Sequence, residues 1–527
     1  MSWTGWLLFF AILQVVHFLG TWKLYKKAGR QAWEAAVPIY NAVVLMKIIN
    51  RPWWWTILLF IPIINLIMIP VVWVETIRSF GKNSALDTAL VLLTFGLYIY
   101  YINYTQDVTY VEDRSLVPRT SAGEWVSSIL FAVVAATLVH TYFMQPFTIP
   151  TSSLEKTLLV GDFLLVSKYH YGARTPMTSV ALPMVHDTIP VVKSKSYLTK
   201  PQYPYFRLPG FQKIKRNEIV VFNWPVDTVN AFQQWGDGKY YYKPIDKKSN
   251  YVKRCVGLPG DSLEVRDGYV YINGKQNELP ERAKLQFGYA FRTSRPLNPS
   301  YAKEQYNISD LYIADKEQSY QVFQAHMTDE EFKKFKNYPY LDTIIKTTLP
   351  KGQLSRGTFP NDARYPFNND HFGPIYIPEA GKTVAITTES IPFYKRIIEV
   401  YEGSELGIEN KISQSGTQVL LNGQPITEYT FKMDYYWMMG DNRNNSEDAR
   451  TWGYVPFNHV VGKPVFVFMS WDGKAQGIKN KIRWERLFTT VGGNGEPVSY
   501  FKYFIIALIG LFAFNFFRKK RKEKAAK

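Results

Sequence analysis

Two adjacent serines and one distant lysine are the residues of this chain whose chemistry could break a peptide bond. Ser152 and Ser153 follow an apolar segment, and Lys253 lies in a strand-like stretch further along. A serine hydroxyl attacks a carbonyl at neutral pH only when a base takes its proton and donors stabilise the oxyanion. A neutral lysine can be that base, but an exposed lysine has a pKa of about 10.4. Burial would have to lower this pKa by roughly 3 units, which costs about 4 kcal/mol.

The stretch around Lys253 alternates apolar and polar residues as a β-strand does. Neighbouring strand residues point to opposite faces, so one of Lys253 and Arg254 should face the core and the other should face away. The sequence does not say which one is buried, and a surface lysine on an edge strand is the alternative. Cys255 is the single cysteine, so no intramolecular disulfide can form. We interpret it as a small apolar side chain of the strand; the alternative is a thiol nucleophile.

Three blocks of sequence carry a family resemblance. They are Pro150-Thr151-Ser152-Ser153-Leu154-Glu155-Lys156-Thr157-Leu158, Lys253-Arg254-Cys255-Val256-Gly257-Leu258-Pro259-Gly260-Asp261 and Gly440-Asp441-Asn442-Arg443-Asn444-Asn445-Ser446-Glu447-Asp448-Ala449-Arg450. In this order, behind a membrane anchor, they resemble bacterial-type signal peptidase I. That family uses a serine nucleophile and a lysine base to remove signal peptides from exported proteins. Leu154 replaces a usual Met and Lys156 stands where Pro is common, but neither departure removes a catalytic group.

The resemblance implies the catalytic roles in this chain. Ser153 would be the nucleophile and Lys253 the general base, with Ser446 orienting that base. Thr151 would help to form the oxyanion hole together with the backbone N–H of Ser153. Ser152 is the neighbouring competitor, but the register of the motif favours Ser153.

The same resemblance implies the supporting groups and the substrate. Asp448 and Arg450 would form an ion pair, and Ile149 and Val252 would line a pocket for small residues before the cleaved bond. Substrates of the family carry Ala-x-Ala-like sites. The expected partners are therefore signal-peptide-bearing preproteins and membrane lipids, near the protein-export machinery.

Other kinds of protein fit the sequence less well. Ser153-Leu154-Glu155-Lys156 matches the Ser-x-x-Lys signature of β-lactamases, but the accompanying Ser-Asp-Asn and Lys-Thr-Gly do not occur in the chain. The histidines lie outside any motif, which disfavours a Ser-His-Asp triad, and we interpret His459 as structural. A membrane scaffold or quality-control protein on an inactive peptidase fold is the alternative from another class. The intact Ser153, Lys253 and Ser446 argue against it.

Composition and charge indicate a membrane protein. The chain has 527 residues, a net charge of +18 and 16% aromatic residues. So basic a chain could bind nucleic acid, but no zinc-finger, RRM or basic-zipper pattern accompanies the charge. Part of it flanks apolar segments, where it suits anionic lipids. No cluster has metal-ligand spacing, so we expect no metal, no cofactor and no nucleic-acid partner.

Long apolar runs predict the elements that anchor the site. A bilayer is crossed by roughly 20 apolar residues, and the candidate runs are 3–22, 53–74, 87–103, 125–144 and 500–517. Basic clusters follow the first and last of these runs, which predicts that both flanks are cytoplasmic. Counting spans between them places residues 145–497 on the extracytoplasmic side of a bacterial inner membrane, in a multi-pass protein.

The polar middle of the chain predicts a mainly β fold with antiparallel sheets, between transmembrane α-helices at both ends. Segments 218–224 and 262–274 read as strands, the second with Asp-Gly and Asn-Gly turn signals. Segment 280–385 is polar and reads as an irregular insertion. The predicted organisation is an N-terminal multi-span module at 1–123, an anchor at 124–144, a catalytic domain at 145–497, and a C-terminal helix with a basic tail at 498–527.

Overall fold

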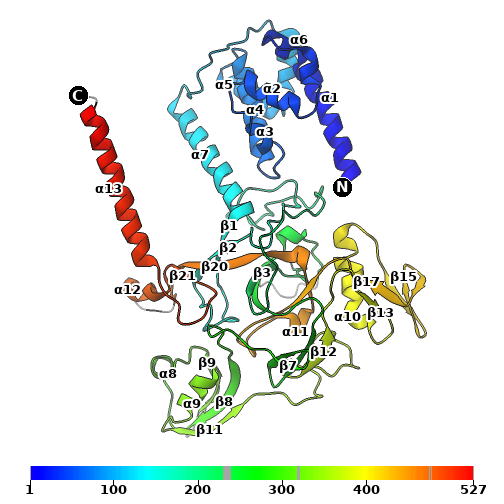
Figure 1. Cartoon of the computed structure of the whole chain (residues 1–527), viewed down its shortest axis with the longest axis vertical. Helices are drawn as coiled ribbons and strands as arrows, with labels where there is room; N and C mark the ends of the chain where they lie inside the picture. Colours follow the sequence, from blue (N-terminus) through cyan, green and yellow to red (C-terminus); the bar gives the residue numbers. More distant parts are fainter. Residues whose placement is uncertain (1, 230–238, 317–320, 474, 476, 526–527) are drawn as a thin grey trace. The chain divides into compact units, whose positions relative to one another are not determined.

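The computed structural model describes residues 2–229, 239–316, 321–473, 475 and 477–525 (Figure 1). The chain forms two compact units. The first comprises Met1–Phe143, Arg174–Leu208 and Thr228–Lys248; the second comprises Met144–Ala173, Pro209–Asp227 and Ser249–Lys527.

The first unit is mainly helical. Its α-helices are α1 (Trp3–Lys27), α2 (Tyr40–Ile48), α3 (Trp55–Leu58), α4 (Asn65–Ser79), α5 (Ala85–Leu93), α6 (Tyr98–Thr105) and α7 (Ser121–Leu138). Helix α1 packs against α6, where the Tyr100 hydroxyl donates to the Val16 carbonyl and the Asn103 amide donates to the Leu19 carbonyl. Glu75 of α4 accepts from Arg51 at 3.0 Å and from Arg114 at 2.6 Å, so this buried carboxylate is paired.

Three helical segments in the described chain are long and apolar enough to cross a membrane: Trp3–Lys27, Ser121–Phe143 and Phe501–Arg521. The predicted run at 87–103 is instead the bent pair α5 and α6, which meet at 116° and count as a fourth candidate only if taken together. The predicted run at 53–74, in which Pro62 and Pro70 suggest kinks, is divided between two helices. Helix α3 ends before Pro62, which lacks a backbone N–H, and α4 starts only at Asn65.

The second unit is built on an antiparallel sheet of eight strands. Their order is β1-β2-β20-β3-β4-β18-β19, and β21 pairs with β20. Their bounds are β1 (Met144–Thr148), β2 (Asp162–Ser167), β20 (Val460–Ser470), β3 (Ile219–Asn223), β4 (Asn250–Gly257), β18 (Tyr435–Met439), β19 (Val455–Pro456) and β21 (Thr489–Thr490). Strand β4 is therefore interior, with β3 on one side and β18 on the other.

Smaller sheets complete this unit. One has the order β12 (Phe372–Tyr376), β5 (Ser262–Arg266), β6 (Tyr269–Ile272) and β7 (Lys275–Gln276). Asp267 and Gly268 join β5 to β6 with φ of 51° and 81°, the conformation that a tight hairpin turn requires and that Asp-Gly allows. The others are β13 (Thr383–Ala385) with β17 (Glu428–Thr430), and β14 (Ile412–Ser415), β15 (Gln418–Leu421) and β16 (Gln424–Ile426).

Part of the predicted insertion is an ordered lobe, residues 287–346, which we call the insertion lobe. It contains a sheet in the order β11 (Leu341–Lys346), β8 (Phe287–Thr293), β10 (Gln321–Met327) and β9 (Leu311–Lys316), with helices α8 (Pro299–Tyr306) and α9 (Asp329–Phe335). An aromatic core that includes Phe291, Phe323 and Phe335 holds it together. The prediction of an irregular segment is wrong here, because spaced aromatic residues form a core that the polar composition obscures.

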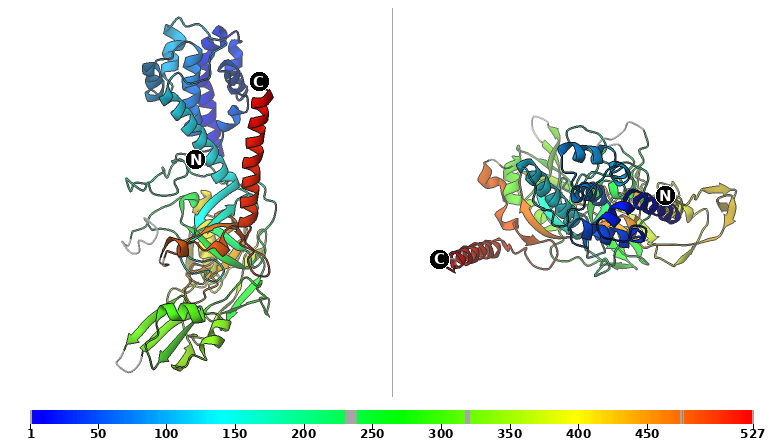
Figure 2. Two further views of the ribbon diagram at one scale, coloured as in Figure 1. Left: turned by 90° about the vertical axis from the view of Figure 1, so that its left-hand side faces the viewer. Right: turned by 90° about the horizontal axis from the view of Figure 1, so that it is seen from above.

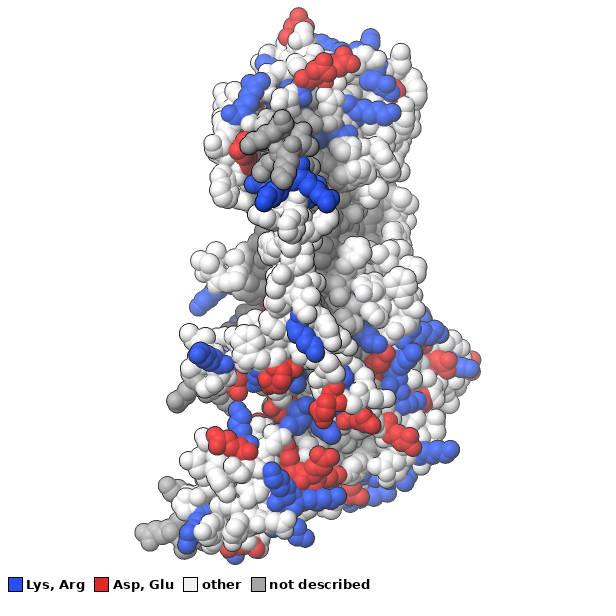
Figure 3. Space-filling view, turned by 60° about the vertical axis from the view of Figure 1, so that its left-hand side comes forward, with Lys and Arg blue, Asp and Glu red and all other residues white. Residues whose placement is uncertain are grey.

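The predicted fold class is confirmed: the central part is mostly antiparallel β, with apolar helices toward both ends. Helix α13 (Phe501–Ala525) is unbroken in both views of Figure 2. On the face shown in Figure 3, basic and acidic side chains intermingle over the β-rich unit.

Candidate active site

Ser153 lies in the loop between β1 and β2, residues 149–161, which we call the Ser153 loop. The loop is anchored at its base, where Ile149 donates its N–H to Asp162 O and Gly161 donates to Ile149 O, both at 2.9 Å. Leu154 and Leu158 bury their side chains in the core beneath it. Ser153 itself is only 6% exposed, so its hydroxyl is held in a fixed, largely dry position.

Lys253 meets Ser153 from β4. Its ammonium Nζ lies 2.8 Å from Ser153 Oγ and also donates to the Val252 carbonyl at 3.2 Å. Lys253 is 3% exposed and is on an interior strand, so the alternative of a surface lysine on an edge strand is wrong. The structure thus brings together two side chains that lie far apart in the sequence.

Burial lowers the pKa of Lys253 to about 8. The carboxylates of Asp448, Glu447 and Asp441 act in the opposite direction, and Arg450 adds to the lowering. Desolvation disfavours the charged form of an amine, and here it outweighs the nearby negative charge. A lysine with this pKa is neutral in a substantial fraction of molecules near pH 8, as a general base must be.

Arg254 is also buried, which corrects the expectation that only one of the two basic neighbours faces the interior. Its guanidinium donates to Asp441 through Nε at 2.7 Å and through a terminal nitrogen at 2.6 Å. The two side chains are 4% and 1% exposed. Lys253 and Arg254 are therefore both buried on β4, and each avoids the cost of an unpaired buried charge in a different way. The pKa of Lys253 is lowered, and Arg254 forms an ion pair with Asp441.

Asp441 belongs to a second loop of the site, residues 440–448 between β18 and α11 (Ala449–Trp452), which we call the Asp441 loop. Its first residue must be small, because a Cβ on Gly440 would lie 2.2 Å from Ser446 Oγ and 2.6 Å from the Ser153 carbonyl. Asn442 donates its N–H to that same carbonyl at 3.1 Å. The Asp441 loop and the Ser153 loop are therefore in direct contact.

Asp448 and Arg450, predicted to pair, form a buried ion pair at 2.8 Å. Asp448 also accepts from the N–H of Gly440 at 3.0 Å, so the pair fixes the start of the Asp441 loop. Burial raises the pKa of Asp448, but the charge and hydrogen bonds of Arg450 outweigh burial and leave that pKa below its ordinary value. The carboxylate is therefore ionised at neutral pH.

The other predicted polar residues lie beside the pair without contacting Lys253. Ser446 Oγ is buried and has no hydrogen-bond partner among the described residues, so the expected bond to Lys253 is not formed. Thr151 is exposed, two residues before Ser153 in the same loop. In the described part of the chain, the backbone N–H of Ser153 is not engaged in a hydrogen bond. Ser152 differs from Ser153, because its hydroxyl accepts from the Asn445 amide at 2.9 Å.

The residues expected to line a substrate pocket are Ile149 and Val252. Ile149 is 3% exposed and belongs to the core cluster with Leu154, and Val252 packs partly buried against the same cluster. Both belong to segments that carry the site, Ile149 to the Ser153 loop and Val252 to β4 beside Lys253, and their role in a substrate pocket stays a prediction.

The chemical alternatives find less support in the geometry. Cys255 is fully buried, and burial raises the pKa of its thiol, which opposes formation of a thiolate nucleophile. His459 is buried against Tyr401, and its ring nitrogens face Asn458 at 2.8 Å and Glu405 at 3.5 Å. Within the described residues, no group of three or more His, Cys, Asp or Glu side chains is placed to hold a metal ion.

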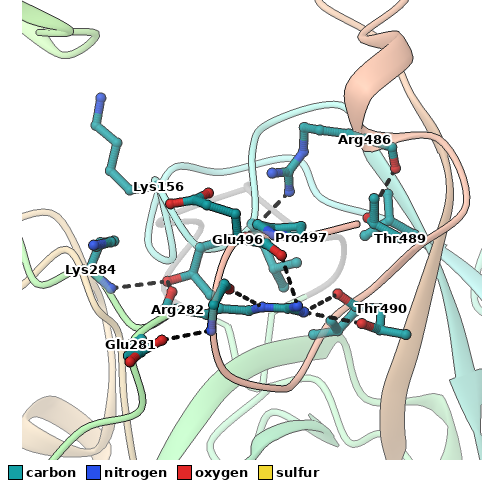
Figure 4. A pocket seen from close by; sticks show the side chains of 14 residues that line it. Lys156, Glu281, Arg282, Lys284, Arg486, Thr489, Thr490, Glu496 and Pro497 are labelled. Carbon is teal, nitrogen blue, oxygen red and sulfur yellow. Dashed lines mark hydrogen bonds between the residues drawn. The ribbon is translucent and has the colours of Figure 1, made fainter. Parts of the chain in front are cut away.

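A pocket of about 330 Å³ lies on another side of the Ser153 loop, where Thr157 and Leu158 line it (Figure 4). It includes neither Ser153 nor Lys253. Its guanidinium groups are already bound: Arg282 donates to the carbonyls of Gly492 and Gly495 among others, and Arg486 binds Asp162. This pocket is therefore not the candidate active site.

Sequence reasoning missed the partners that hold the two loops together. Asp441 accepts from Arg254 and also from the Thr157 hydroxyl at 2.7 Å. Its place in the third sequence block was a signal that could have found it. Asp310, in the insertion lobe, accepts from the amides of Asn442 and Asn445, and no motif marks it.

The chain is similar to known signal peptidases. The family model described as "Signal peptidase, peptidase S26" matches residues 122–354 and 380–471. A second model, a family of unknown function (DUF5684), matches residues 33–113. Together the two matches cover most of the β-rich unit and much of the helical module.

Curated relatives include three proteins named signal peptidase I, each 24% identical to this chain. The Buchnera aphidicola protein (strain APS) aligns over 67% of this chain and 74% of its own length. The Helicobacter pylori protein aligns over 70% and 91%, and the Haemophilus influenzae protein over 72% and 79%.

Proposed function

Since the chain belongs to the peptidase S26 signal peptidase family, we propose that it is a membrane-bound serine endopeptidase that removes N-terminal signal peptides from exported preproteins. Residues 145–497 form its catalytic domain on the extracytoplasmic side of a bacterial inner membrane. The relatives named signal peptidase I support this assignment of activity and substrate.

One observation carries the proposal: Lys253 Nζ lies 2.8 Å from Ser153 Oγ, with both residues buried and the lysine pKa lowered to about 8. The distance is that of a hydrogen bond through which a proton can move. The lowered pKa supplies the neutral amine that the transfer needs.

In the proposed reaction, neutral Lys253 takes the proton of Ser153 as Oγ attacks the carbonyl carbon of the scissile bond. The oxyanion is stabilised by the free N–H of Ser153 and by the Thr151 hydroxyl. When the C–N bond breaks, the Lys253 ammonium returns a proton to the leaving amine, which becomes the N-terminus of the mature protein. The signal peptide stays esterified to Ser153 until Lys253 activates a water that releases it.

Supporting groups keep this pair in place. Ser446 lies at the contact between the two loops and orients the base once a substrate or water completes its hydrogen bonds. Asp448 and Arg450 fix the Asp441 loop. Ile149 and Val252 border the site and accept small residues before the cleaved bond. Candidate membrane spans on either side of the β-rich part keep the site near the bilayer surface, where a signal peptide emerges.

The test is cleavage of a preprotein with an Ala-x-Ala site by the detergent-solubilised full chain. Ser153→Ala should abolish cleavage, with a loss of roughly 10⁴-fold or more when a nucleophile is removed. Ser152→Ala is the matched control and should retain measurable cleavage, because its hydroxyl does not contact Lys253. Equal cleavage by wild type and Ser153→Ala would rule out Ser153 as the nucleophile.

A further inference from the structure

The insertion lobe contacts the Asp441 loop along the backbone. Gln286, at the entrance to the lobe, donates its N–H to the Asp441 carbonyl at 3.0 Å and accepts from the N–H of Arg443 at 2.9 Å. Gly288 of β8 donates to the Asn444 side chain at 2.9 Å. The lobe is therefore attached to the same loop that touches the Ser153 loop.

A side chain of the lobe continues this contact. Asp310 Oδ2 accepts from the Asn442 amide and from the Asn445 amide, each at 3.2 Å. The same two amide groups donate to Ser152: Asn442 to its carbonyl at 3.2 Å and Asn445 to its hydroxyl at 2.9 Å. Two amides thus bridge one carboxylate of the lobe to the residue next to Ser153.

Asp310 can hold both amides because it is charged. Burial raises its pKa, but His326, Asn445 and Ser152 together outweigh burial and leave the pKa below its ordinary value. A carboxylate accepts two hydrogen bonds on one oxygen readily, and bonds to a charged acceptor are stronger than neutral ones.

The lobe also holds the far side of the Ser153 loop. Lys156 has a φ of 71°, a left-handed conformation that costs energy for a residue with a side chain. Its ammonium lies 3.1 Å from Glu331 of α9, and both side chains are mostly buried. Ser153 is therefore flanked by two contacts with the lobe, one through Ser152 and one through Lys156.

We propose that Asp310 is a positioning residue for the peptidase reaction: through Asn442 and Asn445 it fixes the Ser153 loop, so the insertion lobe completes the active site. This inference rests on the proposed function. Asp310 does not touch the reacting atoms, and it acts by keeping Ser153 Oγ within reach of Lys253.

Steady-state cleavage of an Ala-x-Ala preprotein by the solubilised full chain tests this role. Asp310→Ala should lower kcat by about 10- to 100-fold, as expected when reacting groups are displaced by about 1 Å, with KM changed by less than about threefold. Asp310→Asn keeps an acceptor oxygen and should recover activity relative to Asp310→Ala. Asp342→Ala, in the same lobe, is the control and should match wild type, because Asp342 is an exposed residue of β11 that pairs with Arg292.

A double-mutant cycle with Asn445→Ala separates positioning from a general loss of structure. If Asp310 acts through Asn445, the double variant should be less impaired than the product of the two single effects. Should Asp310→Ala fail to fold, Asn445→Ala alone carries the test and should show the same loss of kcat. A kcat equal to that of wild type in Asp310→Ala or Asn445→Ala, or fully additive effects in the double variant, would overturn the role of Asp310. The proposed peptidase function would stand in that case, because the wild-type protein still cleaves the preprotein. No cleavage by the wild type would overturn both.

Discussion

Arg254 binds Asp441 through hydrogen bonds of 2.7 and 2.6 Å on the face of β4 opposite to Lys253. Asp441 in turn accepts from Thr157 in the Ser153 loop. The two basic neighbours on β4 therefore make different contacts. Lys253 contacts Ser153, and Arg254 connects the strand to the Asp441 loop and, through Asp441, to the Ser153 loop.

Asp441→Asn should lower the free energy of unfolding by about 3–5 kcal/mol, because it removes the buried carboxylate that neutralises the Arg254 charge. Chemical denaturation of the solubilised protein measures this change. The matched control is Asp362→Asn, which breaks the more exposed pair with Arg364 at 2.6 Å and should cost far less, because water screens an exposed pair. Similar losses in the two variants would contradict the structural role of the buried pair.

The buried charge of Lys253 should make stability depend on pH. Its pKa is about 8 in the folded protein against an ordinary value of 10.5, a difference of about 3 kcal/mol. Below pH 8 both states are protonated and the folded state carries the full cost. Between pH 8 and 10.5 the unfolded state binds more protons, so stability rises with pH as that cost disappears.

Lys253→Met removes this titration. The difference in Tm between Lys253→Met and wild type should therefore favour the variant most at pH 7 and shrink as the pH approaches 10.5. Thermal unfolding at several pH values measures it. A difference that does not vary with pH would mean that the lysine pKa is not lowered.

Glu331→Gln should slow cleavage, because it removes the charged partner of Lys156 in the insertion lobe and leaves the Asn307 carbonyl as the other acceptor of the Lys156 ammonium. The substitution leaves the start of α9 intact, since Glu331 forms a capping box with Thr328 and Gln can replace Glu in that motif. The control is Glu330→Gln, whose side chain is 84% exposed. The measurement is the turnover rate of each variant, which should be lower for Glu331→Gln than for Glu330→Gln. Equal rates would show that the Lys156 contact does not affect Ser153.

Much of the site could be predicted from the sequence because its residues lie in three compact motifs. The roles of Ser153 and Lys253 were implied by the resemblance of those motifs to a known family, but the contact between the two side chains could not be read from the sequence. The antiparallel strands followed from alternation and from Asp-Gly and Asn-Gly turns. The burial of both Lys253 and Arg254 could not be predicted, because an alternating pattern is typical of a strand with one face in the core and the other exposed to solvent. It depends on β4 being an interior strand covered on both sides.

Other features depended on contacts between distant segments. The insertion lobe was hidden by its polar composition, and nothing near Asp310 in sequence indicates that it reaches Asn442 and Asn445. The break in the run at 53–74 had a visible cause in Pro62, but only the structure shows that the chain ends one helix there and starts another at Asn65.

The pH dependence of kcat/KM for preprotein cleavage tests the central claim most directly, because it reports the base in the free enzyme. The Ser153–Lys253 pair predicts a rate that rises about tenfold per pH unit below the pKa of about 8 and levels off above it. A rate that is flat or falls between pH 6 and 9, in protein that remains folded, would contradict a neutral Lys253 acting as the base for Ser153.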